Sequence, residues 1–470
     1  MKSRVEQMKR IFFILLFSFC ILFSHAQKPR LIVLTDIGQD PDDEQSMVRL
    51  LHYANEFQLE GLIATADNNY KHEAPVIRDD IIHKMIDDYA KCVDNFNIHA
   101  DGFPTPIYLH HTVKKGNYKG GTKVQLEDFI GEGHDTEGSE WIISVVDRPN
   151  VSPVNIAVWG GASDLAQALW KIKNTRSETE MGKFVDKLRV YFIANQDASN
   201  QWIIDNFPEL WIILSLDESG NSWLSGFRGM FWGGDMSNTT KEWIHENVHG
   251  HTALADNYPD KASTGGESKN PHMALKEGDT PSFLYFLPNG LNVIQHPEWG
   301  GWGGRFKEIK PNLYNDAEDT FYDVSKGKTI TSSRATVFRW REDFQNDFMA
   351  RIDWGANADY SEANHKPLAV VNGDIDTKPL HIFASPRKTI KLDAIISHDP
   401  DRDDLTIAWK RYPEADTYYG EVKIRPRRKG KAKVKIPKDA AGTNIHIICK
   451  ITDDGTPRLS GYKRIIIEVL

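Results

Sequence analysis

The sequence predicts an α/β protein with a mostly parallel sheet covered by helices on both faces, followed by a small all-β sandwich. Two observations support this fold class. Between residue 30 and about residue 350, continuous apolar runs alternate with amphipathic segments, which is typical of buried parallel strands separated by helices. From about residue 375 onward, short alternating runs are separated by Pro, Gly and Asp turns, which is typical of a sandwich.

The elements of the first region are predicted in order along the chain. RLIVLTD (30–36) reads as a strand, and DEQSMVRLLHYANEF has the apolar spacing of a helix. LEGLIATAD is the next strand, and residues 74–96 form a clear amphipathic helix. VNIAVWGG, KLRVYFIAN and ELWIILS are further strands, and DLAQALWKIKN is the helix that follows the first of these.

Two later segments have a different composition. The segment from about 220 to 335 is rich in Gly, Trp, Asn and Asp, and it is expected to form long loops over a site, with short helical pieces. In the sandwich, the basic run RPRRKGKAKVK is interpreted as a solvated edge strand, because Lys discourages edge-to-edge pairing. Contact with a polyanion is the alternative interpretation.

Residues 1–26 have the organisation of a secretory signal peptide. A basic start is followed by the apolar run IFFILLFSFCILF and by the small-residue cleavage site Ser24-His25-Ala26. The mature chain is expected to begin at Gln27 and to be exported, to the periplasm or out of the cell. An uncleaved anchor is the alternative, and no later segment is apolar enough over a sufficient length to cross a bilayer.

The length and charge of the chain limit its organisation and its partners. The 470 residues exceed one ordinary core, so two domains are predicted, at 27–365 and 375–470. The net charge of −9 argues against a nucleic-acid partner, since phosphate needs a basic face. Cys92 and Cys449 are expected as buried free thiols rather than a disulfide. The oligomeric state is left open, and a homo-oligomer is one possibility.

The most informative stretch is LTDIGQDPDDEQ, which begins at residue 34 and crowds four aspartates directly after the first apolar strand. These are Asp36, Asp40, Asp42 and Asp43. In an open parallel sheet, ligands bind beyond the carboxyl ends of the strands. Crowded carboxylates need a cation or stay protonated, and a hard ion such as Ca²⁺ fits oxygen ligands best. The alternative is a solvated acidic loop in which Asp42 and Asp43 face the dipole of the following helix.

Several stretches, taken together and in one order, resemble the bacterial cellulose-binding, nucleoside-hydrolase-like family. The resemblance covers most of residues 29–470, including the C-terminal cadherin- or Ig-like sandwich that this family also carries. The stretches are Thr35–Asp43, Glu60–Ala64, Glu137–Trp141, Val158–Ala162, Glu277–Leu284 and Trp302–Arg305.

The resemblance implies a Ca²⁺ site at the carboxyl edge of the sheet. Asp36 matches the residue that binds the ion and helps to activate water, and Asp43 matches a ligand that is often bidentate. Asp42 matches the residue that contacts a sugar hydroxyl. The backbone carbonyl of Ser163 and the carboxylate of Asp279 complete the implied ligands. The implied activity is hydrolysis of an N-glycosyl, or else an O-glycosyl, bond of a small sugar-containing substrate, with an oxocarbenium-like transition state.

The sequence departs from the hydrolase pattern around the substrate. The position before the final metal Asp, commonly His in the hydrolases, holds Gly278, and the preceding Glu277 is the candidate acid. The residues that grip the ribose have no clean match. Asn195 and Asp197 after one strand, and Asn68 after another, are the candidates for substrate binding, with polar turns as the alternative interpretation.

An aromatic stretch and two acidic loops are further candidate binding features. Trp302 and Arg305 are candidates for a sugar platform with a charged rim, with a salt-bridged structural Arg as the alternative. The acidic loops 397–404 and 453–455 of the sandwich either bind Ca²⁺ or are plain Asp-rich turns. The rival to an enzyme is a non-catalytic protein that binds a glycan such as cellulose in the same pocket; a degenerate relative that keeps the metal for stability is a third reading.

Overall fold

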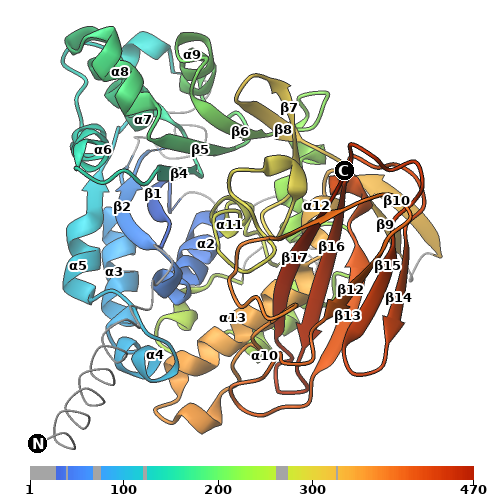
Figure 1. The fold of residues 1–470 in the computed structure, drawn as a ribbon. Coiled ribbons are helices and arrows are strands. Elements are labelled where there is room, and N and C mark those ends of the chain that lie inside the picture. Colours follow the sequence, from blue (N-terminus) through green and yellow to red (C-terminus); the bar gives the residue numbers. More distant parts are fainter. Residues whose placement is uncertain (1–27, 39–40, 67–75, 120–123, 261–273, 324–326) are drawn as a thin grey trace, which may run out of the picture.

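The first domain is built on an eight-stranded sheet with the order β3-β2-β1-β4-β5-β6-β8-β7 (Figure 1). The structure is a computed structural model that describes residues 28–38, 41–66, 76–119, 124–260, 274–323 and 327–470. All neighbouring pairs are parallel except the edge pair of β7 and β8. The strands are β1 (Arg30–Thr35), β2 (Gln58–Ala64), β3 (Val113–Lys115), β4 (Val154–Val158), β5 (Leu188–Ile193), β6 (Trp211–Ser215), β7 (Phe306–Lys310) and β8 (Leu313–Asp316).

Helices cover both faces of this sheet, as predicted. One face packs on α6 (Glu137–Asp147), α7 (Ser163–Thr175), α8 (Glu178–Val185) and α9 (Ala198–Asn206). The other packs on α2 (Pro41–His52), α3 (Asp79–Tyr89), α4 (Val93–His99), α5 (Pro106–Thr112), α10 (Lys241–Asn247), α11 (Thr280–Leu284), α12 (Ala335–Phe338) and α13 (Arg341–Ala356).

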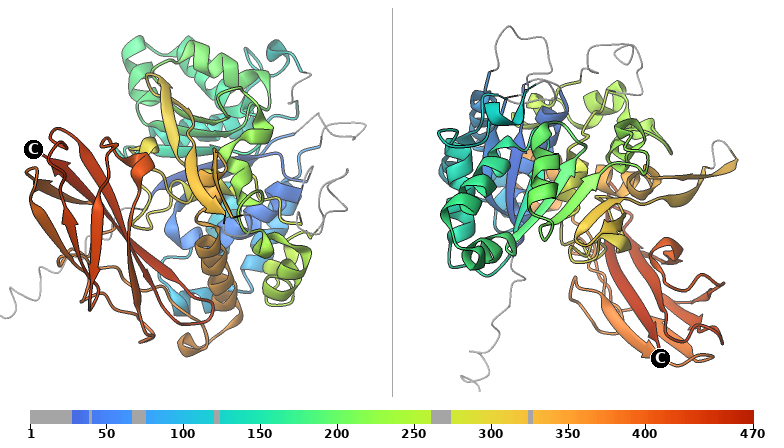
Figure 2. Two further views of the ribbon diagram at one scale, coloured as in Figure 1. Left: turned by 90° about the vertical axis from the view of Figure 1, so that its right-hand side faces the viewer. Right: turned by 90° about the horizontal axis from the view of Figure 1, so that it is seen from above.

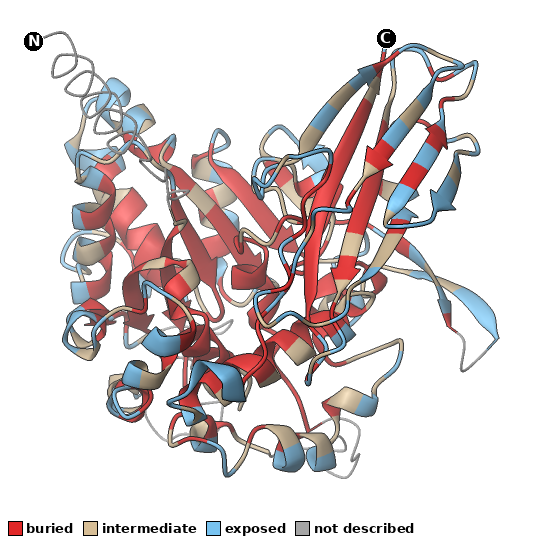
Figure 3. Cartoon of the chain, turned by 60° about the horizontal axis from the view of Figure 1, so that its bottom comes forward, coloured by how far each residue is buried: buried red, intermediate tan, exposed pale blue. Residues whose placement is uncertain are grey.

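Alternation along the buried strands explains this two-sided packing. In β1, Leu31 and Val33 belong to one core cluster, while Ile32 and Leu34 belong to the other. Successive side chains of a strand point to opposite faces, so an uninterrupted apolar run fills both cores at once. Figure 3 shows the resulting buried interior between the helical layers.

Two sequence-based expectations about local structure were wrong in detail. Residues 74–96 do not form one helix, because the chain turns at 90–92 so that α4 packs on α13. The segment 220–335 is not only loops, since it contributes β7, β8 and the hairpin of β9 (Asp319–Asp323) and β10 (Lys328–Ser332). These strands are short, polar and mostly at edges, so no apolar run marks them in the sequence.

The C-terminal domain is a two-sheet β structure, as predicted. One sheet has the order β11-β17-β16-β13 and the other β12-β15-β14. The basic run contains β14, which lies at a sheet edge, and β15, which lies in the middle of its sheet. The strands are β11 (Leu380–Ala384), β12 (Thr389–Asp393), β13 (Thr406–Arg411), β14 (Lys423–Arg427), β15 (Lys431–Lys435), β16 (Asn444–Thr452) and β17 (Ser460–Val469).

The sandwich lies to one side of the α/β layers (Figure 2). Its Ile448 and Tyr462 join the apolar core of the first domain, and polar contacts add to this junction. Asp343 of α13 accepts hydrogen bonds from Lys450 and Tyr462 of the sandwich. Arg464 donates to the carbonyls of Leu291 and Gly300, at 2.9 and 2.7 Å. These contacts are buried, except that of Lys450, which is partly buried, and they tie β16 and β17 to the first domain.

Some sequence-based expectations lie outside the described residues, namely the signal peptide over 1–26, Asp40 and Asn68. The domain limits 27–365 and 375–470 stay a prediction, although Ala369 and Val371 already pack in the core of the sandwich. Cys92 and Cys449 are buried free thiols. None of the helices in the described ranges has the length and apolar character to cross a membrane.

Candidate metal centre and substrate site

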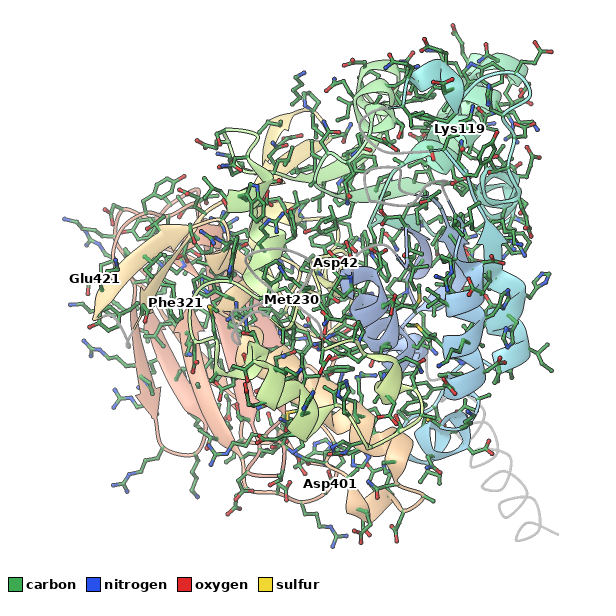
Figure 4. All side chains as sticks on the ribbon, turned by 180° about the vertical axis from the view of Figure 1, so that it is seen from behind. Asp42, Lys119, Met230, Phe321, Asp401 and Glu421 are labelled. Carbon is green, nitrogen blue, oxygen red and sulfur yellow. The ribbon has the colours of Figure 1, made fainter. Side chains whose placement is uncertain are left out.

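Aspartates from two distant segments converge beyond the carboxyl end of β1. Asp42 and Asp43 lie in the first turn of α2, and Asp279 immediately precedes α11. One carboxylate oxygen from each lies within 4.8 Å of the others. Figure 4 labels Asp42, which lies at the start of α2.

Asp36 belongs to the same acidic group. The pKa of Asp43 lies well above its ordinary value because burial disfavours the charged form and because Asp36, Asp279 and Asp42 repel it. The hydroxyl of Thr35 donates to Asp43 and opposes this rise. Four carboxylates held this way can all be ionised only if a cation compensates their charge. Since every side-chain donor is an oxygen, the set suits a hard divalent cation.

The backbone around this acidic group leaves room for the carboxylates. A Cβ on Gly160, just after β4, would lie 2.5 Å from Oδ1 of Asp36, so Asp36 can take this position only beside a glycine. The indole N–H of Trp159 donates to Ser282 at 2.9 Å, and the Ser282 hydroxyl donates to the Asp279 carbonyl at 2.6 Å. The end of β4 therefore holds the segment that carries Asp279 in place.

Glu277, the predicted acid, lies in a buried ion pair. Arg49 of α2 donates to both of its carboxylate oxygens, at 2.5 and 2.8 Å, and both side chains are fully buried. The hydroxyls of Tyr258 and Thr280 also donate to Glu277. All of these partners are buried side chains. These contacts fix the segment 277–280 against α2 and thereby position Asp279.

The residues predicted after β4 and β5 lie along the same edge of the sheet. Ser163 begins α7, three residues after Gly160, and is buried. Asp197 caps α9 by accepting the N–H of Ser199, and it also accepts the N–H of Ala162 at 3.1 Å. Burial raises the pKa of Asp197. Asn195 is exposed at this edge, so of the described residues predicted to bind substrate it is the one that is both near the site and free to face solvent.

Trp302 and Arg305 lie near the junction with the sandwich, where Trp302 contacts Tyr462. Trp302 is 3% exposed, and its ring packs edge-on against Phe344 and Tyr462. Arg305 forms an ion pair with Asp319 at 2.7 Å and donates to a backbone carbonyl at 2.6 Å. A sugar platform needs an exposed ring face, whereas these contacts are those of packing residues.

The acidic loops of the sandwich also converge. Asp399, Asp401 and Asp403 each place an oxygen within 4.8 Å of the others, and Asp401 binds the ring of His365 at 3.0 Å. Burial raises the pKa of Asp453, in the neighbouring loop, to about 6. Figure 4 shows Asp401 far from Asp42, so this group is separate from the candidate metal centre. Another set that could hold a cation is His245, His249 and Asp260.

Two contributors to the site escaped the sequence-based analysis. Thr35, which ends β1, orients Asp43, and its position beside Asp36 was the only signal for this role. Gln196 donates from its amide to the carbonyls of Trp159 and Ile193, which joins the ends of β4 and β5. A lone Gln after a strand carries no signal of that kind.

An open, mostly parallel sheet with an acidic group beyond its carboxyl ends is the arrangement expected of a nucleoside-hydrolase-like α/β protein. The chain belongs to the family described as "Cellulose-binding Sde182, nucleoside hydrolase-like domain", whose profile matches residues 30–306. Residues 389–469 match "Cellulose-binding protein Sde0182, C-terminal domain". The family expected from the sequence motifs is thus confirmed.

A solved structure supports the same assignment over nearly the whole chain. It is described as a nucleoside hydrolase-related hypothetical protein from Saccharophagus degradans that is associated with carbohydrate metabolism. The two chains share 34% sequence identity, the match covers 94% of this chain and 100% of that one, and the TM-score is 0.77.

Two solved cadherin structures match only a small part of the chain. Fragments of mouse PcdhgC3 and human CDH23 match at 19% and 16% identity over 22% of this chain, covering 33% and 34% of theirs, with TM-scores of 0.15 and 0.17. No curated protein matches the chain.

Proposed function

We propose that the chain is an exported, Ca²⁺-dependent hydrolase that cleaves a glycosidic bond, N-glycosyl or else O-glycosyl, of a sugar-containing substrate. The observation that carries this proposal is the convergence of Asp36, Asp42, Asp43 and Asp279 in a largely buried group whose mutual repulsion raises the pKa of Asp43. Family membership supports a carbohydrate ligand, since the matching families are described as cellulose-binding.

The residues divide into ligands and reacting groups. Asp36, Asp43, Asp279 and the carbonyl of Ser163 would hold the ion. When bound, Ca²⁺ supplies positive charge that lowers the pKa of a nearby water and attracts the vicinal hydroxyls of a sugar. Asp36 is then the group that accepts a proton at its carboxylate, and Asp42 orients a sugar hydroxyl. The negative surroundings stabilise the positive charge that develops on the sugar in the transition state.

Asp42 suits its proposed role because it is the more exposed of the pair. Asp43 is buried and held by Thr35, whereas Asp42, one residue earlier in the same helical turn, is only half-buried. A residue that contacts substrate must keep a face open to solvent, while a metal ligand need not. Asn195, exposed after β5, is our candidate for a contact with the same ligand from the end of a strand two positions away from β1 in the sheet.

The proposal is tested by assaying release of base from nucleosides and of reducing sugar from oligosaccharides, with Ca²⁺ and with EDTA. Turnover that requires Ca²⁺ and is lost in Asp36→Asn and Asp43→Asn is expected. Asp147→Asn is the matched control, because Asp147 pairs with Arg176 on the surface. Turnover that persists in EDTA, or in Asp43→Asn, contradicts the proposal.

A second function is favoured by the contacts of Glu277. Its carboxylate is held by Arg49, Tyr258 and Thr280, and the next residue is Gly278, so this segment supplies no obvious group to protonate a leaving group. The alternative is a protein that binds a glycan such as cellulose at this site without cleaving it. Tight glycan binding together with no release of base or reducing sugar would establish this alternative.

A further inference from the structure

A cavity separate from the acidic group opens on the first domain between the end of β6 and the β9–β10 hairpin. Its volume is about 510 Å³, within the range of small-ligand sites. Its walls come from the loop after β6, from β10 and from the start of α12. The lining residues are Asp217, Leu224, Gly233, Glu318, Ile330, Thr331, Ser332, Ser333, Arg334 and Phe338.

The guanidinium of Arg334 has unused hydrogen-bonding capacity in this cavity. It is half-buried, and burial alone lowers its pKa. Within the described residues it makes no ion pair and no hydrogen bond, and its recorded contact is the ring of Trp232, at 5.4 Å from the ring centre. By contrast, the nearby Arg305 and Arg339 both bind Asp319. A partly desolvated guanidinium that has no acceptor among the described residues is a group that a ligand can satisfy.

Two tryptophans, Trp223 and Trp232, are chain neighbours of residues that line the cavity. Trp223 is 53% exposed and lies 5.8 Å from Trp232, centre to centre. Arg228 lies over the Trp223 ring at 4.4 Å, which fixes the plane of the indole. Trp223 directly precedes Leu224, and Trp232 directly precedes Gly233; both of these following residues line the cavity. An exposed, fixed indole offers an apolar face that suits the C–H face of a sugar ring.

The charges in the cavity favour a neutral polyol over an anion. Asp217 and Glu318 line the same cavity as Arg334, so a phosphate or a uronate would face two carboxylates. A sugar hydroxyl both donates and accepts, and vicinal hydroxyls can therefore bridge the carboxylates and the guanidinium. The hydroxyls of Thr331 and Ser332 extend this polar wall, while Leu224, Ile330 and Phe338 supply an apolar one.

The segment 226–233 connects this cavity to the candidate metal centre. At one end Phe227 lies against Gly278, beside Asp279, since a Cβ on that glycine would lie 3.4 Å from the ring. Further along, Gly229 lies directly against the backbone carbonyl of Arg334. The cavity also starts beyond the end of β6, three strands from β1, which at the usual strand spacing is about 14 Å from the acidic group. A single nucleoside does not span that separation, whereas a short glycan chain does.

We infer that this cavity, with Trp223 and Arg334 as its principal contacts, is a second sugar subsite that binds a neutral β-linked glucan chain extending from the metal centre. This subsite rests on the proposed function, which supplies the carbohydrate ligand. It makes the substrate an oligosaccharide or polysaccharide end rather than a free nucleoside.

Binding of cellotetraose to the full chain, measured by calorimetry and by Trp fluorescence, tests the inference. Trp223→Ala and Arg334→Met should each raise the Kd by about tenfold or more. Tyr419→Ala is the matched control, because Tyr419 is a 93% exposed aromatic on the sandwich. Unfolding midpoints of all variants should match wild type, which shows that any loss of binding is local. Wild-type affinity in Trp223→Ala and Arg334→Met, or no cellotetraose binding by wild type, overturns the inference.

A further variant separates this inference from the proposed function. Asp43→Asn should abolish Ca²⁺ binding and turnover but leave cellotetraose bound through Trp223 and Arg334. Hydrolysis of nucleosides without any binding of cellotetraose would refute the subsite and leave the hydrolase proposal standing. Binding that depends on Trp223 without any hydrolysis would refute the hydrolase and leave the subsite standing.

Discussion

Replacing Asp43 with Asn should change the stability of the protein in opposite directions with and without Ca²⁺. Asp43 is buried and surrounded by Asp36, Asp42 and Asp279, and this repulsion together with burial raises its pKa well above the ordinary value. The Asn side chain keeps the shape of Asp and can still accept the hydrogen bond from Thr35. The substitution therefore removes a charge while leaving the packing almost unchanged.

The size of the effect follows from the geometry. At 4.8 Å and an effective dielectric constant of about 20, two unit charges repel by about 3.5 kcal/mol. Two such neighbours, Asp42 and Asp279, already exceed the cost of protonating a carboxyl of ordinary pKa 3.8 at neutral pH, which is about 4 kcal/mol. Protonation therefore limits the penalty, and without metal Asp43→Asn should stabilise the chain by up to about 4 kcal/mol.

Ca²⁺ should reverse the order of stability of wild type and Asp43→Asn. A ligand at about a hundred times its Kd stabilises the folded state by about 2.7 kcal/mol, and still more at higher excess. Wild type gains this stabilisation, whereas Asp43→Asn lacks one of the proposed ligands and gains little. The response to Ca²⁺ is therefore large in wild type and small in the variant.

The assay is urea denaturation of both proteins in EDTA and in saturating Ca²⁺, with Asp147→Asn as the surface control. The expected result is an unfolding free energy that is higher for Asp43→Asn in EDTA and that rises with Ca²⁺ in wild type. A variant less stable than wild type in EDTA, or an equal response of both proteins to Ca²⁺, would refute the electrostatic reasoning.

Three further predictions concern the surroundings of this site. Glu277→Gln leaves the buried Arg49 without its counter-charge and should lower the unfolding free energy by about 3–5 kcal/mol in urea; a variant of wild-type stability that has lost turnover would instead make Glu277 a reacting acid. Gly160→Ala places a Cβ 2.5 Å from Asp36 and should weaken Ca²⁺ binding by about tenfold to a hundredfold in calorimetry, whereas Gly182→Ala, which meets nothing within 4 Å, should leave it unchanged. Asp316 is buried with a pKa of about 7 against an ordinary value of 3.8, so its contribution to stability is complete at low pH and falls as pH rises through about 7. Between pH 3.8 and pH 7 the unfolding free energy of wild type should fall by up to about 4 kcal/mol relative to that of Asp316→Asn. Parallel curves of unfolding free energy against pH would contradict the raised pKa of Asp316.

Local patterns were sufficient for much of the fold. The apolar runs of β1, β4, β5 and β6 are long enough to identify buried parallel strands, and each is followed by polar residues at the same edge of the sheet. The edge strand β7 and its neighbour β8 were missed because Phe306–Lys310 and Leu313–Asp316 are short and polar. A strand at the edge is stabilised by the backbone hydrogen bonds of its neighbour, and sequence periodicity does not record those bonds.

The candidate site was also predicted only in part from the sequence. The crowding of Asp36, Asp42 and Asp43 after a strand is visible in the sequence, and the inclusion of Asp279 came from a family resemblance. The roles of Trp302 and Glu277 could not be read, because each depends on which side chains from distant segments surround it. Trp302 packs against the sandwich residue Tyr462, and Glu277 pairs with Arg49, more than two hundred residues earlier in the chain.

The sequence by itself determined the two-domain α/β and β architecture, the family and the acidic segment after the first strand, since these depend on residues adjacent in the chain. Only the tertiary structure decided which carboxylates share one acidic group and which aromatic rings remain exposed. Burial and charge compensation arise between segments that are distant in the sequence, so they are properties of the packed chain and not of any stretch within it.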